Sequence, residues 1–127
     1  MAGRTFQPLL GALDPGVVVL GISWAPNGSS AVDQTSIKGR GVASVARTAQ
    51  GVFTVTMQDV YPTLLAAVAT AQLATAADIV AQVGTSTLTA NGKTIVVSLL
   101  AGATATDVAA DANNRVNLLL ILKNSSV

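Results

Sequence analysis

The chain of 127 residues contains no cysteine, no histidine and no glutamate, so all six of its acidic residues are aspartate. Without cysteine, neither disulfides nor thiolate metal sites can form. Without His and Glu, the side chains that can transfer protons are reduced mainly to Asp, Lys and a single Tyr. We therefore predict that the protein is not an enzyme and binds no cofactor.

Charged and aromatic residues are also scarce. Charged residues make up 10% of the chain, where about 25% is usual for a soluble domain. The hydrophobic fraction is 50%, the aromatic fraction is 3% and the formal net charge is +1. A protein that stays monomeric normally keeps its surface charged and its net charge away from zero. This composition predicts that other protein surfaces, either copies of the chain or subunits of an assembly, cover much of its exterior.

A membrane-bound protein is the competing explanation for so little charge. Residues 60–77 carry no charged side chain and approach the length of a membrane-spanning helix. However, Pro62 and several polar residues interrupt this stretch, and Asp78 follows it. The apolar run near the N-terminus is split by the sequence Asp-Pro-Gly at 14–16, which makes it a poor signal peptide. We therefore predict no membrane partner.

The length suits one domain. We predict an extended N-terminal arm at residues 1–16 and a single domain at residues 17–127. The arm carries four large apolar side chains, which are Phe6, Leu9, Leu10 and Leu13. Because exposed apolar groups are unfavourable, the arm either folds back on its own domain or contacts a neighbouring subunit. We predict these four side chains as partner-contact residues.

Most of the domain is typical of short β-strands. Runs rich in β-branched residues lie at 17–24, 42–47, 52–57, 94–100 and 115–123. In residues 52–57, Phe53, Val55 and Met57 alternate with threonines, which is the pattern of a half-buried strand. We expect the preceding strand to place Ala43 and Val45 inward, and a turn that ends at Gly51 to join the two. The core is predicted around Trp24, Val55 and Leu120.

Two segments complete this prediction. In residues 115–123 both faces of the strand are apolar, which predicts cover on both sides by the fold or by a neighbour. Residues 64–83 contain eight alanines, which favour a helix slightly. The same stretch can form two strands broken near residues 75–78. The many short strands favour an antiparallel β-sandwich over a fold built from βαβ units.

Few side chains could take part in catalysis or bind a metal ion. Asp107 and Asp111 could form a carboxylate pair, and with Asn113 and Asn114 they offer oxygen ligands of the kind that Ca²⁺ prefers. Their spacing fits no calcium loop, and aspartates beside a turn usually cap it. We therefore predict neither a catalytic residue nor a metal site.

The densest basic cluster is Lys38, Arg40 and Arg47. Nucleic-acid binding requires a larger basic surface with aromatic side chains on which bases can stack. The only aromatic residue nearby, Phe53, is predicted to be buried. The sequence therefore predicts no nucleic-acid partner and no small-molecule substrate.

Three stretches, GRGVASVARTAQGVFTVTMQDVYP (39–62), KTIVVSLL (93–100) and NRVNLLLILKNSS (114–126), resemble small virion structural proteins of tailed bacteriophages. The resemblance covers residues 37–126 and implies an all-β, jelly-roll-like sandwich, with strands in residues 64–83. It also implies a decoration or cement protein on the virion's capsid surface, with the major capsid protein and further copies of itself, as a dimer or trimer, as partners.

Two alternative functions stay open. The first is a phage tail or fibre component that displays the sandwich for attachment, although such surfaces are usually richer in aromatic residues. The second is a small bacterial ligand-binding module, which would need a concave pocket with converging polar groups.

Overall fold

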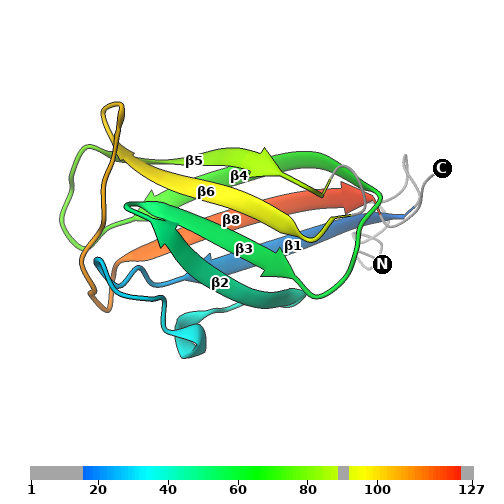
Figure 1. Cartoon of the computed structure of the whole chain (residues 1–127), viewed down its shortest axis with the longest axis horizontal. Helices are drawn as coiled ribbons and strands as arrows, with labels where there is room; N and C mark the ends of the chain where they lie inside the picture. The colour runs from blue at the N-terminus through cyan, green and yellow to red at the C-terminus, as the bar shows by residue number, and fades with distance from the viewer. Residues whose placement is uncertain (1–15, 89–91, 124–127) are drawn as a thin grey trace, which may run out of the picture.

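The computed structural model describes residues 16–88 and 92–123. The chain forms two antiparallel sheets that pack face to face (Figure 1). Sheet A has the order β1 (Val17–Trp24), β8 (Arg115–Lys123) and β4 (Thr63–Gln72). Sheet B has the order β2 (Val42–Ala49), β3 (Val52–Met57), β6 (Thr94–Ala101) and β5 (Ile79–Ser86), and the short β7 (Thr104–Ala105) pairs with β6. The predicted all-β sandwich is confirmed.

Each strand alternates between the interior and the outside. In β3 and β6, every second side chain is buried, and β8 buries Val116, Leu118, Leu120 and Leu122. Trp24 and Phe53 meet across the two sheets, with ring centroids 5.7 Å apart and planes at 60°. The predicted core residues Trp24, Val55 and Leu120 are all fully buried. One apolar layer between the sheets therefore holds the fold together.

The alanine-rich segment at 64–83 forms β4, a loop at 73–78 and β5, rather than a helix. The reason lies in the pairing of β4 with β8. The partly buried Ala67 and Ala69 lie opposite the large Leu120 and Leu118. Small side chains beside large ones let the layer pack without overfilling it. The slight helical preference of alanine is thus overridden by tertiary packing, as the resemblance implied.

The hairpin of β2 and β3 forms as predicted, with one correction. Gln50 and Gly51 form the turn, and Gly51 has a φ of 66°, which a residue with a Cβ rarely adopts. A Cβ at Gly51 would also lie 2.6 Å from the backbone nitrogen of Thr106. Ala43 was expected to point inward together with Val45, but it is exposed, because the register with β3 shifts between Val42 and Ser44.

The connection between β1 and β2 covers the edges of both strands. It contains a short 3-10 helix, η2 (Gln34–Ser36). The side-chain amide of Gln34 donates to the carbonyl of Val45 at 2.8 Å and accepts from its N–H at 3.2 Å, as a neighbouring strand would. The backbone of Lys38 pairs in the same way with Ser23 of β1. These contacts occupy edge positions that could otherwise pair with another chain.

Two neighbouring leucines of β6 test the assignment of its two faces. Leu99 is fully buried, while Leu100 lies on the outside and is only partly covered. We expect Leu99→Ala to lower the free energy of unfolding by about 2–5 kcal/mol, and Leu100→Ala to lower it by about 1 kcal/mol. Urea denaturation of both variants measures the difference. Equal losses would contradict the assignment of the two faces.

Candidate interaction surfaces

The charged side chains that the structure describes avoid the middle of both sheets. Most lie in loops, and Arg115 and Lys123 are the first and last residues of β8. Arg47 points inward near the end of β2, because it lies opposite the buried Phe53. The outer faces of the sandwich are therefore formed almost entirely by uncharged residues, which makes them the candidate functional surfaces.

The outer side of sheet B is a broad uncharged surface, which we call the sheet B face. Its residues alternate with the buried or partly buried residues of the same strands and are mostly threonine, serine, valine and alanine. They are Ser44, Ala46, Thr48, Val52, Thr54, Thr56, Val80, Gln82, Gly84, Thr94, Val96, Ser98 and Leu100. Val80 is 58% exposed. A surface of this kind can be buried against another protein without removing an ionised group from water.

The outer side of sheet A is more apolar and is hollowed. Val19, Leu119 and Val68 from its three strands are 44%, 43% and 55% exposed. Gly21 of β1 has no side chain and pairs with Leu119 of β8. Together with Lys38 and Gly39 of the β1–β2 connection, the three strands line a groove of about 460 Å³, which we call the sheet A groove. The outer apolar face of β8, which the sequence predicted to be covered, is thus only partly covered by the described residues.

Gly21 was not predicted as a functional residue, although its position within a predicted strand is unusual. It interrupts the β-branched run VVVLGISW, and a glycine within a strand often marks a place where another group approaches closely. A Cβ added at Gly21 would meet no atom within 4 Å among the described residues. Packing against the residues of the sandwich therefore does not require glycine at this position.

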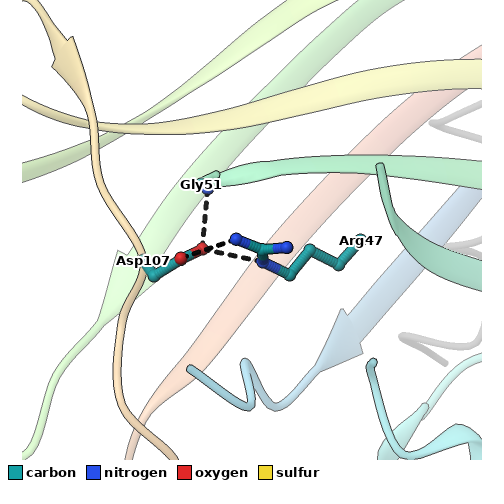
Figure 2. A network of polar contacts seen from close by, with 3 residues as sticks. All are labelled: Arg47, Gly51 and Asp107. Carbon is teal, nitrogen blue, oxygen red and sulfur yellow. Dashed lines mark hydrogen bonds and ion pairs between the residues drawn. The ribbon is translucent and has the colours of Figure 1, made fainter. Parts of the chain in front are cut away.

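An ion pair closes one end of the sandwich (Figure 2). Arg47 Nη2 lies 2.7 Å from Asp107 Oδ2, and Arg47 Nε donates to Asp107 Oδ1 at 2.9 Å. The backbone N–H of Gly51 donates to the same Oδ1 at 2.8 Å. These hydrogen bonds from Arg47 and then from Gly51 lower the pKa of Asp107 below its ordinary value. Asp107 thus ties the connection to β8 onto the β2–β3 turn.

The other polar side chains near Asp107 also hold loops in place. Asp111 Oδ1 accepts from the N–H of Asn113 at 2.8 Å. Asn114 accepts from the N–H of Ala74 at 2.7 Å and donates to the carbonyl of Ala109 at 3.0 Å. Within residues 16–88 and 92–123, no group of three or more His, Cys, Asp or Glu residues could hold a metal ion.

Of the three basic residues that lie close together in the sequence, Arg47 and Lys38 have different surroundings in the structure. The guanidinium of Arg47 binds Asp107 at the end of the sandwich, while Lys38 lines the sheet A groove. The four predicted contact residues, which are Phe6, Leu9, Leu10 and Leu13, lie outside the described residues. In the part of the chain that the structure describes, no helix is long and apolar enough to cross a membrane.

Comparison of the chain with protein-family models, with curated proteins and with solved structures found no match. The structure therefore defines a class, an antiparallel β-sandwich with uncharged outer faces, and a fold of this kind does not by itself assign a function. The resemblance to phage virion proteins stays a prediction.

The ion pair predicts how stability depends on pH. Because the pKa of Asp107 is lowered in the folded protein, its contribution to stability is present above the ordinary carboxyl pKa and is lost as the pH falls through the folded value. We expect Asp107→Asn to be less stable than the unmodified protein near pH 7. The difference should shrink below about pH 4.

Thermal unfolding of both proteins between about pH 7 and pH 2.5 measures this dependence. Asp78→Asn is the control for the loss of one negative charge, because Asp78 is exposed and forms no ion pair with any described residue. A difference between Asp107→Asn and the unmodified protein that stays constant at every pH would contradict the assigned role of the ion pair.

Proposed function

We propose that this protein is a non-enzymatic structural subunit that attaches to a larger protein assembly through the sheet B face. In the specific form that the sequence resemblance suggests, the assembly is a phage capsid, whose outer surface this jelly-roll-like sandwich decorates and stabilises. The partners are then the major capsid protein and further copies of the chain, as a dimer or trimer.

The observation that carries this proposal is the absence of charge from the sheet B face. A surface that stays in water gains solubility from charged residues, yet none lies on this face of the described strands. Its hydroxyl groups can form hydrogen bonds across an interface, and its short apolar side chains are small enough to allow close packing. The Thr48 and Thr54 hydroxyls, 3.4 Å apart, illustrate how these groups are arranged on the face.

The size of the face limits the affinity of one copy. Four strands about 4.8 Å apart, with about eight residues each at about 3.3 Å, cover about 500 Å². Specific interfaces usually bury about 800 Å² on each partner. A single copy should therefore bind weakly, and stable attachment requires several linked copies on a repeating lattice. This requirement favours a self-associating subunit on an assembled shell.

The alternative functions differ from the proposed one in the number of copies expected per particle. A tail or fibre component would occur in few copies per particle, whereas a shell-decorating subunit would approach the copy number of the shell subunit. A ligand-binding module would be missing from purified particles. Quantitative mass spectrometry of particles purified on a density gradient, from cultures in which this chain is produced, separates the three functions.

A single charged side chain on the sheet B face tests the proposed attachment surface. We expect Ser98→Lys, on the partly covered outer side of β6, to reduce the copy number per purified particle at least about tenfold, because the lysine would be buried without a partner. The variant should still fold, since a lysine at this position can extend into water in the free subunit.

Ala77→Lys is the matched control. Ala77 is exposed in the loop between β4 and β5 and is not one of the residues of the sheet B face, so this variant should be incorporated normally. Incorporation of Ser98→Lys at the level of the unmodified protein would show that the sheet B face is not the attachment surface.

A further inference from the structure

We propose that residues 6–13 of the chain bind in the sheet A groove of the same molecule. The sequence left two destinations open for the N-terminal arm, which are its own domain and a neighbouring subunit. The geometry of sheet A points to its own domain. This inference goes beyond the proposed function and is independent of it, because that function rests on the opposite face of the sandwich.

The sheet A groove offers a mostly apolar site, with Ser23, Thr70 and Asn117 also in its lining, that the described residues leave open. Val68 and Leu119 line it, and Gly21 forms part of its floor because it has no side chain. Glycine weakens a strand compared with valine or isoleucine. Since no described atom would contact a Cβ at position 21, the space above Gly21 is available to an additional apolar group.

A second copy packed on this face would bury too little surface. Three strands about 4.8 Å apart, with about nine residues each on average at about 3.3 Å per residue, cover about 430 Å². This is about half of the 800 Å² that a specific interface takes from each partner. A segment of the same chain needs less area, because its attachment to β1 gives it a high effective concentration.

The position of the arm in the chain fits this site. Gly16, the residue before β1, has a φ of 84°, and the sequence Pro-Gly at 15–16 is typical of a turn that reverses the chain. Gly21 lies five residues after this turn. In a chain that doubles back at about 3.3 Å per residue, the residue above Gly21 is near position 11. Leu9, Leu10 and Leu13 therefore come within about two residues of the groove.

The chemistry of the arm also matches the groove. Residues 6–13, FQPLLGAL, carry no charged side chain. Lys38 is the one charged residue among those that line the groove, and it lies in the connection rather than on the strands. An uncharged apolar segment can therefore fill the groove without burying an unpaired charge.

Because the chain has no cysteine, a pair of introduced cysteines can test the contact without interference. We expect the full-length Leu10→Cys, Val68→Cys variant to form a disulfide within one chain under mild oxidation. The matched control is Leu10→Cys, Val80→Cys, because Val80 is equally accessible but lies on the sheet B face. The first pair should react at least about tenfold faster than the control.

Non-reducing electrophoresis and mass spectrometry distinguish the outcomes. A monomer with an internal disulfide supports the proposal. A disulfide-linked dimer as the main product would place the arm on a neighbouring molecule and overturn it. Equal rates for the two cysteine pairs would also overturn it, because the arm would then have no preference for the sheet A groove.

Filling the groove provides a second test. We expect Gly21→Val to fold, because the position is in a strand and has space for a side chain, and to slow the disulfide between positions 10 and 68 at least about tenfold. Ala46→Val adds similar bulk to the sheet B face and should leave the rate unchanged. An unchanged rate in the Gly21→Val variant would overturn the proposal, whereas incorporation into particles tests only the sheet B face.

Discussion

Strand β8 holds sheet A together, because β1 and β4 both pair with β8 and not with each other. Its inward side chains Leu118, Leu120 and Leu122 are buried between the sheets. The pairing joins the beginning, the middle and the end of the described chain, so sheet A depends on contacts that are distant in sequence. The alanines of β4 pack against the leucines of β8, and Gly21 of β1 lies opposite Leu119 of β8. Both features therefore depend on pairing with this strand.

The few charged residues stabilise the connections rather than the sheets. Arg47 and Asp107 fix the segment that leads into β8. Arg115 donates to the hydroxyl of Ser23 at 2.9 Å and to the carbonyl of Ser36 at 2.7 Å, which ties β8 to the β1–β2 connection. Because the charged residues lie at strand ends and in loops, the two outer faces stay almost entirely uncharged. The few charged residues of the described chain are thus placed where they leave the outer faces free for contact with another protein. This placement supports the proposed attachment role.

Sequence patterns predicted more of the fold than of the surfaces. The β-branched runs located β1, β3, β6 and β8 closely, and alternation identified the core around Trp24, Val55 and Leu120. Alternation failed at Ala43, because the shift in register between β2 and β3 depends on how the two strands pair. The groove could not be predicted, since it requires Gly21, Leu119 and Val68 from three strands to lie side by side.

The sequence by itself determined which residues can be buried and how little charge the exterior can carry, because composition and period-2 alternation are local properties. Only the tertiary structure decided that residues 64–83 form strands, since Ala67 and Ala69 gain more from lying beside the leucines of β8 than from helix formation. It also decided that Asp107 binds Arg47, because residues 60 positions apart meet only when β6 pairs with β3 and β7 in sheet B and brings the segment after β7 beside the β2–β3 turn.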